Sequence, residues 1–371
     1  MRVKDFKLER FFAKYEFSAP YLLCSSDCES FNIKELLELE KNSEKELNQL
    51  WLGYTESQGD PRLRKEISKL FKNINLDEIL VFAGAEEGIF IFMNVLLKKG
   101  DNVIVQYPAY QSLYEIADSI GCEVTKWEMS DKNNWELDIE FLKKNIKKNT
   151  KAIIINCPHN PTGYLMSKEK FNQIIQIAEE KNIHIFSDEV YRYLEYKETD
   201  RLPAMADIYE KGISLGVMSK TFGLAGLRIG WISTRDKELF KKIASFKDFT
   251  SICNSAPSEF FSTLALKHKE HLIKRNLEII DKNLKLLDKF FDKYNHLFEW
   301  VRPKAGSIAF PRIKFKNNVE DFCIDVVNKK GVLLLPSTKY DSGNKHFRIG
   351  FGRKNMPEAL KKLEEYIKEH L

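Results

Sequence analysis

One lysine in this chain stands in a setting that favours covalent chemistry. Lys220 follows the apolar run Ile213–Met218, which we predict to be a buried strand, and glycines and other small residues come after it. A lysine at the end of a buried strand is costly to desolvate unless it is neutral, paired or covalently used. A neutral amine has a free lone pair on nitrogen and can condense with an aldehyde. The alternative, a surface lysine in a glycine-rich loop, is the simpler interpretation for a lysine taken alone.

Two upstream segments carry further polar groups that favour the chemical interpretation. Asp188 comes shortly after another predicted buried strand, where a carboxylate needs a cationic partner; alternatively it caps a helix that has Glu189 in its first turn. Tyr191 is three residues later, which is one turn of such a helix, so its hydroxyl can share a site with Asp188. Asn160 lies in the segment 156–163, whose prolines and glycine force an irregular turn. Together these segments supply an amide, a carboxylate, a phenol and an amine.

A regular alternation of elements between about residues 77 and 235 positions these groups. Short apolar runs predict strands over Ile79–Ala83, Asn102–Gln106, Glu123–Trp127, Ala152–Asn156, His184–Ser187, Ile213–Met218 and Ile229–Ser233. Amphipathic stretches such as Ser167–Lys181 lie between several of them. This alternation indicates an α/β fold with a mainly parallel seven-stranded sheet sandwiched by helices. Ligands of such sheets bind at the carboxyl ends of the strands, which is where the polar groups fall.

The remainder of the chain indicates a second, smaller domain. Apolar residues repeat at steps of four and three from Ile273 to Phe291, which predicts a long amphipathic helix between two domains. Short strands near residues 307–311 and 347–351 and a final helix from Pro357 follow it. We therefore expect an N-terminal segment over 1–50 that packs on the small domain, a large domain over 51–270, and a small α/β C-terminal domain over 271–371 that includes the interdomain helix.

Composition excludes several classes of function. The net charge of +5 is dispersed over 371 residues, and no cluster of basic and aromatic residues indicates nucleic-acid binding. No apolar run approaches the roughly 20 residues of a membrane span, and the start of the chain lacks a signal-peptide core. The six cysteines have no paired metal-ligand spacing, so we expect no metal site and reduced thiols. These features favour a cytoplasmic protein that binds neither nucleic acid nor membrane.

The combination of groups matches the needs of a pyridine-based electron sink, which requires a carboxylate at its ring nitrogen, a lysine for a Schiff base and a phosphate cradle. On these motifs the chain resembles the class I/II aminotransferases of the fold type I pyridoxal-phosphate-dependent enzymes, over nearly its whole length. The resemblance implies pyridoxal 5′-phosphate as cofactor, held by the large domain. It also implies a homodimer with shared active sites.

The resemblance assigns roles to residues around the cofactor ring. It implies that Lys220 forms the Schiff base and then acts as acid and base, and that Asp188 pairs with the ring nitrogen. Tyr191 and Asn160 would hydrogen-bond the ring's phenolic oxygen. Tyr110, in the run Tyr107–Tyr110, resembles the aromatic residue that stacks on the ring.

The resemblance also implies a phosphate site. Ala85 and Glu86, between a predicted strand and an apolar helix, would offer backbone N–H groups to the phosphate. Ser219 and Arg228 would complete this site, the arginine through a charge-assisted pair. Tyr54 resembles the tyrosine that reaches the phosphate of the neighbouring subunit.

The substrate's α-carboxylate would bind Arg348, with Asn160 beside it, because arginine offers bidentate geometry; Arg353 is a competing candidate. The chain departs from the family's pattern in two places. Val217 stands where the family commonly has a serine or glycine, so one phosphate contact is expected to be missing. The segment Ser18–Asp27 lacks the family's common glycine-containing substrate loop, so substrate choice cannot be transferred from familiar members.

These features predict an enzyme that moves the amino group of an α-amino acid to a 2-oxo acid. The same site would also serve a pyridoxal-phosphate-dependent lyase, cyclase or oxidase acting on an amino acid. A regulator with an aminotransferase-like sensing domain would need a DNA-binding module, and the residues before Tyr54 show no helix-turn-helix pattern. A dicarboxylate substrate would require a second cationic group; Arg192, Arg312 and His159 are available, but each is as easily structural.

Overall fold

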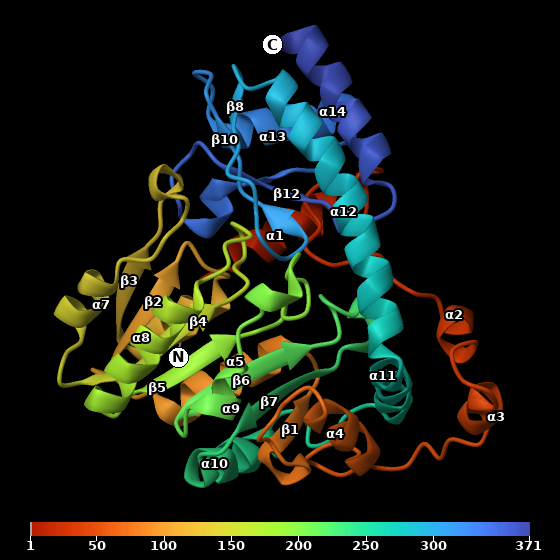
Figure 1. The fold of residues 1–371 in the computed structure, drawn as a ribbon, viewed down its shortest axis with the longest axis vertical. Helices are drawn as coiled ribbons and strands as arrows, with labels where there is room; N and C mark the ends of the chain where they lie inside the picture. The colour runs from red at the N-terminus through yellow and green to blue at the C-terminus, as the bar shows by residue number, and fades with distance from the viewer. Residues whose placement is uncertain (1) are drawn as a thin grey trace.

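A computed structural model describes residues 2–371, which contain a seven-stranded sheet in the order β1-β7-β6-β5-β4-β2-β3 (Figure 1). Its strands are β1 Ile79–Phe82, β2 Asn102–Tyr107, β3 Glu123–Glu128, β4 Thr150–Asn156, β5 His184–Asp188, β6 Gly212–Val217 and β7 Gly230–Thr234. Neighbours from β3 through β6 pair in parallel, whereas β7 is antiparallel to both β6 and β1. The expected strands all form, and the mainly parallel α/β fold is confirmed.

Alternate residues of the central strands face opposite helix layers. In β4, Ile154 packs in the cluster that contains Phe92 of α5, whereas Ile153 and Ile155 pack in the cluster that contains Phe171 of α8. The covering of both faces therefore explains why β4 is almost uniformly buried and why its residues Ala152–Ile155 are all apolar. The helices of this part are α4 Pro61–Ser68, α5 Ala85–Leu96, α6 Ser112–Ile120, α7 Ile139–Asn145, α8 Lys168–Lys181, α9 Met205–Ile208, α10 Lys237–Lys247 and α11 Ala256–Lys267.

The expected long helix is α12, Lys269–Lys293, which runs along one side of the molecule to the C-terminal part (Figure 1). That part contains β8 Phe298–Glu299, β9 Ile308–Ala309, β10 Arg312–Ile313, α13 Val319–Lys330, β11 Leu335–Pro336, β12 Phe347–Gly350 and α14 Met356–His370. Strand β12 pairs with both β11 and β9. The domain boundaries expected at about residues 50 and 270 remain predictions.

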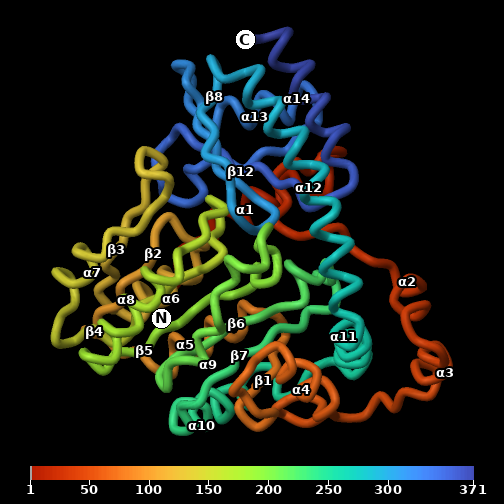
Figure 2. Tube along the Cα trace, in the orientation of Figure 1, coloured from red at the N-terminus to blue at the C-terminus, as the bar shows by residue number. Residues whose placement is uncertain are grey.

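The N-terminal helices are α1 Lys7–Tyr15, α2 Ile33–Leu37 and α3 Ser43–Asn48. Figure 2 shows α1 between the sheet and the C-terminal part, and the chain then runs outward to α2 and α3. Between these helices, Tyr21 bridges to Val332, and the Leu23 carbonyl accepts from the Gly350 amide at 2.9 Å. These contacts hold the N-terminal chain across the carboxyl ends of the large sheet's strands. None of the helices within residues 2–371 is long and apolar enough to cross a membrane.

Candidate active site

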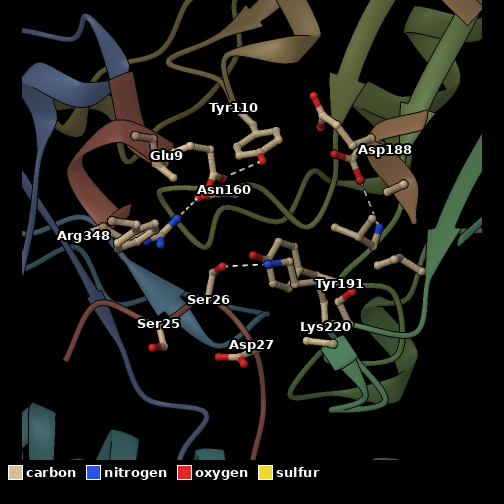
Figure 3. Close-up of a pocket in the computed structure, with 18 of the residues that line it drawn as sticks. Glu9, Ser25, Ser26, Asp27, Tyr110, Asn160, Asp188, Tyr191, Lys220 and Arg348 are labelled. Carbon is tan, nitrogen blue, oxygen red and sulfur yellow. Dashed lines mark hydrogen bonds between the residues drawn. The ribbon is translucent and has the colours of Figure 1, made fainter. Parts of the chain in front are cut away.

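A cavity of about 520 Å³ lies where β4, β5 and β6 end, and the N-terminal chain closes it (Figure 3). Most of the expected site residues line it: Ala85, Glu86, Tyr110, Asn160, Asp188, Tyr191, Ser219, Lys220, Arg228 and Arg348. The N-terminal chain contributes Phe6, Leu8, Glu9, Phe12, Glu16, Ser25, Ser26 and Asp27. Residues from distant parts of the sequence thus meet in one cavity.

The amine of Lys220 faces this cavity beyond the end of β6. Its Nζ donates to the Oγ of Ser26 at 2.8 Å, a contact between residues far apart in the sequence. Burial lowers the pKa of Lys220, because a charged ammonium is poorly solvated there. The strand-end position that the sequence predicted therefore gives the amine a greater tendency to be neutral and nucleophilic.

Asp188 is the last residue of β5, and it is buried. Its Oδ1 accepts from the backbone N–H of Val190 at 3.2 Å, and no ion pair involving Asp188 forms within residues 2–371. Burial raises the pKa of this carboxyl to about 7. The chain turns over residues 190–193 instead of forming a helix. Both the helix-cap alternative and the placement of Tyr191 one helical turn along are therefore wrong, because an aspartate-centred turn replaces the helix.

The turn nevertheless brings Tyr191 into the cavity. Its hydroxyl is buried and has no hydrogen-bond partner in the described part of the chain, although the Ser26 side chain lies close to it. An unpartnered buried hydroxyl is costly, so its position is best explained by a polar group of a ligand.

Asn160 lies beside Arg348 (Figure 3). Its amide oxygen accepts from the Tyr340 hydroxyl at 3.0 Å and from Arg348 Nη1 at 3.3 Å. These bonds fix the orientation of the side chain, because the oxygen must face its two donors. The amide nitrogen is therefore the group that Asn160 can present to a ligand.

Arg348, in β12, is buried without a carboxylate partner among residues 2–371. Its Nε donates to the Cys24 carbonyl at 3.0 Å, and its Nη1 donates to the Tyr340 hydroxyl at 2.7 Å. The competing candidate, Arg353, instead forms two bonds with Asp27, at 3.1 and 2.8 Å. Of the two arginines, Arg348 is therefore the one whose charge is available to a bound carboxylate.

The N-terminus of α5 forms an anion site with Arg228. Gly84 precedes the helix with φ at +94° and has no side chain to cap it. The first N–H groups of the helix therefore donate no hydrogen bond to a side chain of the capping residue and can bind an anion. A Cβ at Gly84 would lie 2.7 Å from Arg228 Nη2, so glycine allows the guanidinium to approach this end of the helix. Ser219 also lines this cavity. The arrangement suits a dianion such as a phosphate monoester.

Glu86 and Tyr110 complete this side of the cavity. The Ser112 hydroxyl donates to Glu86 Oε2 at 3.0 Å, and burial raises the pKa of Glu86 to about 7. The Tyr110 hydroxyl donates to Glu9 Oε1 at 3.1 Å. Tyr110 is thus held at its hydroxyl end by the N-terminal helix.

The remaining candidates lie elsewhere. Tyr54 is 88% exposed and does not line the cavity. The possible second cations are also outside it: Arg192 donates to the Leu70 carbonyl, Arg312 pairs with Asp131 and Glu299, and His159 is buried beside Thr162. Val217 does line the cavity, at the position where the family commonly has a serine or glycine.

Sequence reasoning singled out the segment Ser18–Asp27, three of whose residues line the cavity, but it missed the residues of α1 and Tyr340. Glu9 and Glu16 belong to no catalytic motif. Their only signal in the sequence is a spacing of seven residues, or about two helical turns, which places both side chains on the same side of a helix. Tyr340 sits in a short 3₁₀ turn and reaches Asn160 only through tertiary folding. No local pattern marks such a contact.

The fold and the cavity define a pyridoxal-phosphate-dependent transferase, and the chain belongs to the aminotransferase class I and II family, which it matches over residues 21–363. It is 29% identical to the aspartate aminotransferase of Pyrococcus horikoshii over 91% of this chain and 87% of that protein. It is 25% identical to the capreomycidine synthase of Streptomyces vinaceus over 99% and 94% of the two chains. A crystal structure of a PLP-dependent aminotransferase from Streptococcus suis superposes with a TM-score of 0.94 at 31% identity, covering 100% of this chain and 99% of that one.

These findings confirm the fold type, the pyridoxal 5′-phosphate cofactor and the transaminase activity that the motifs predicted. The family acts on amino acids and 2-oxo acids. The alternative of a lyase, cyclase or oxidase is not favoured, since the solved PLP-dependent cyclase that the chain resembles is distant, at 25% identity. The residues present fit the cofactor: the unpartnered Tyr191 hydroxyl, the uncompensated Asp188 carboxyl and the anion site at α5 could receive its phenolic oxygen, ring nitrogen and phosphate.

Proposed function

We propose that the cavity around Lys220 is where this enzyme transfers the amino group of an α-amino acid to a 2-oxo acid, with Asp188, Tyr191, Asn160 and Arg348 in the roles expected from the sequence. The observation that carries this assignment is the set of polar groups left without protein partners in one cavity. Asp188 has no cation, the Tyr191 hydroxyl has no partner, and Arg348 has no carboxylate within residues 2–371. A bound cofactor and an α-amino acid would satisfy all of them.

Each side chain then has a definite task. The cofactor supplies an aldehyde and an electron-poor ring. Asp188 holds a proton on the ring nitrogen through a charge-assisted hydrogen bond, and Tyr191 and Asn160 donate to the phenolic oxygen. With the cofactor bound, Lys220 Nζ would take the proton from the substrate's Cα as a base and give it back as an acid within the same site. Ser26 keeps the amine in position between these two tasks.

The substrate is oriented by its α-carboxylate. Arg348 binds that group, and Tyr340 and the Cys24 carbonyl hold the guanidinium so that it does not reorganise on binding. At the other end of the site, the N–H groups of Ala85 and Glu86, with Ser219 and Arg228, hold the phosphate.

We further propose a homodimer in which Tyr54 contacts the cofactor of the partner subunit. Tyr54 is among a set of large apolar side chains that this single chain leaves exposed, which also includes Trp51, Leu52, Phe249 and Ile252. Exposed apolar side chains of this size favour association with another chain. A cytoplasmic location is part of the same proposal, and its support is that all six cysteines are free thiols.

A single-turnover spectrum of the cofactor-loaded protein tests the assignment. In the absence of a 2-oxo acid, an amino acid substrate should convert the cofactor's aldehyde band to the band of its amine form and leave one equivalent of keto acid. Release of ammonia with an unchanged cofactor would instead support a lyase or an oxidase. Absence of any spectral change across all the common amino acids would contradict the proposal.

The dimer has its own test. Light scattering should give twice the mass of one chain. Mixing inactive Lys220→Ala protein with Tyr54→Phe protein should produce hybrid dimers. In each hybrid, one of the two sites combines a native Lys220 from one chain with a native Tyr54 from the other, and this site should be active. A monomer with full activity would contradict the shared site.

A further inference from the structure

The cavity contains more acidic side chains than the cofactor and the α-amino acid group require. Its acidic residues are Glu9, Glu16, Asp27, Glu86 and Asp188, and its basic residues are Lys220, Arg228, Arg348 and Arg353. On the proposed function, each basic group has a partner. Lys220 joins the cofactor, Arg228 meets the phosphate, Arg348 meets the α-carboxylate, and Arg353 is paired with Asp27.

The acidic groups are not all matched. Asp188 would pair with the ring nitrogen, and Asp27 pairs with Arg353. Glu86 accepts from Ser112 beside the phosphate site. This leaves Glu9 and Glu16, and neither forms an ion pair within residues 2–371.

Both of these glutamates come from the N-terminal helix. Glu9 lies in α1 and Glu16 at its C-terminal end, with Phe12 between them, and all three line the cavity. Figure 3 shows Glu9 near Asn160 and Arg348, across the cavity from Asp188 and Lys220. The two glutamates therefore lie on the side where a substrate's side chain would extend once its carboxylate is held by Arg348.

The glutamates also influence one another. Burial raises the pKa of Glu16, and the nearby Glu9 and Asp27 carboxylates raise it further. The nearby Arg353 and Arg348 charges lower this pKa in part, but Arg353 is already paired with Asp27 and Arg348 is the proposed partner of the α-carboxylate. Like charges held together in a partly buried site without a cation of their own are unfavourable. A bound cation would remove this repulsion.

A separate feature of this side of the cavity is the unneutralised charge of Arg348. Arg348 is 2% exposed, its charge has no carboxylate partner in the described chain, and its guanidinium faces the cavity next to the Phe12 ring, 5.7 Å from the ring centroid. The same molecule that places a carboxylate on Arg348 would extend past Phe12 toward Glu9 and Glu16.

We propose that Glu9 and Glu16 form a subsite for the positively charged side chain of an α-amino acid substrate, an ammonium or a guanidinium. This inference rests on the proposed function of the cavity. Phe12 contacts the aliphatic part of the side chain, and the two carboxylates receive its charged end. Aspartate and glutamate are poor substrates, because their side chains would meet two carboxylates and no free cation.

Matched pairs of amino acids test this proposal. Arginine and citrulline have nearly the same shape and differ in charge. Norleucine has the four-carbon chain of lysine without its ammonium, and ornithine and glutamate extend the series. In single-turnover spectra, at least one cationic amino acid should react with a kcat/KM at least 10-fold above its neutral counterpart, and glutamate should be slower still. Calorimetric binding should show the same order. Equal values for charged and neutral partners, or a preference for glutamate, would overturn the proposal.

Variants separate the subsite from the rest of the enzyme. Glu9→Gln and Glu16→Gln should each reduce the preference of arginine over citrulline, or lysine over norleucine, by about 10-fold, chiefly through KM for the cationic substrate. Glu278→Gln, at an exposed position of α12, is the matched control and should leave the ratio unchanged. A preference that survives both substitutions would also overturn the proposal. If no amino acid of any charge changes the spectrum, the proposed function itself has failed.

Discussion

The Tyr340 hydroxyl lies 2.7 Å from Nη1 of Arg348 and also donates to the Asn160 amide oxygen at 3.0 Å. One phenol thus holds both the residue proposed to bind the α-carboxylate and the residue proposed to face the cofactor. Tyr340 is almost fully buried, and burial raises its pKa to about 12. It therefore stays protonated and can donate one hydrogen bond while accepting another.

Tyr340→Phe should raise KM for the amino acid substrate by about 10-fold and lower kcat less. The guanidinium loses one acceptor and the Asn160 oxygen loses one donor, which is worth roughly 1–2 kcal/mol. Steady-state kinetics with the preferred amino acid measure this effect. Tyr209→Phe is the control, because its buried hydroxyl donates to the Ile183 carbonyl away from the cavity. An equal loss in both variants would mean that Tyr340 serves stability alone.

Arg348→Ala should raise KM for every amino acid tested, by at least about 100-fold, because the bond to the α-carboxylate is common to all of them. Arg353→Ala should raise it much less, since the Arg353 charge is already neutralised by Asp27. Initial-rate kinetics over several amino acids distinguish the two arginines. A larger increase in KM for Arg353→Ala than for Arg348→Ala would mean that Arg353 binds the α-carboxylate.

Lys220→Ala should abolish turnover, with a loss of at least about 1000-fold, and should remove the absorbance of the covalently held cofactor. The fold should remain intact, since the amine makes one hydrogen bond, to Ser26. Absorbance spectra and circular dichroism check the two parts of this prediction. As a control, Lys247→Ala removes another buried amine, one that donates to the Ser57 and Ile252 carbonyls, and should reduce stability without removing the absorbance.

The strands and the residues at their ends were predictable, whereas the residues that arrive from distant segments were not. Strand ends follow from local patterns: apolar runs fix β4, β5 and β6, and parallel pairing places their carboxyl ends at one edge. Asp188 and Asn160 were found for this reason. The turn after Asp188 carries no local signal that separates it from the start of a helix, because aspartate favours a helix cap and an aspartate-centred turn alike.

The N-terminal chain shows the limit of local reasoning. Ser26 reaches Lys220 across 194 residues of sequence, and Glu9 reaches Tyr110 across 101. Such contacts depend on how α1 packs between the sheet and the C-terminal part, and the sequence of α1 alone indicates only an amphipathic helix. We assign substrate selectivity to this helix, and for that reason the sequence motifs do not predict it.

The stability of the cofactor-free protein should depend on the ionisation of Asp188. Burial raises its pKa from 3.8 to about 7, so the native state retains a proton that the unfolded chain loses above pH 4. This group therefore stabilises the native state most at low pH, and its contribution falls as the pH rises toward 7. Asp188→Asn removes this dependence. The free energy of unfolding of the variant relative to wild type should therefore increase by about 2 to 3 kcal/mol between pH 5 and pH 8.

Urea unfolding of wild type and Asp188→Asn at pH 5 and pH 8 measures that difference. Other titrating groups contribute equally to the unfolding free energies of the two proteins, so their contributions cancel in the comparison. Glu86, whose pKa is also raised to about 7, should give the same sign in Glu86→Gln. Addition of pyridoxal 5′-phosphate should weaken the Asp188 effect, because a ring nitrogen that carries a proton stabilises the carboxylate and lowers its pKa. A pH dependence that is the same in wild type and Asp188→Asn would show that the carboxyl is already compensated without the cofactor, and the pairing proposed for it would then lose its physical basis.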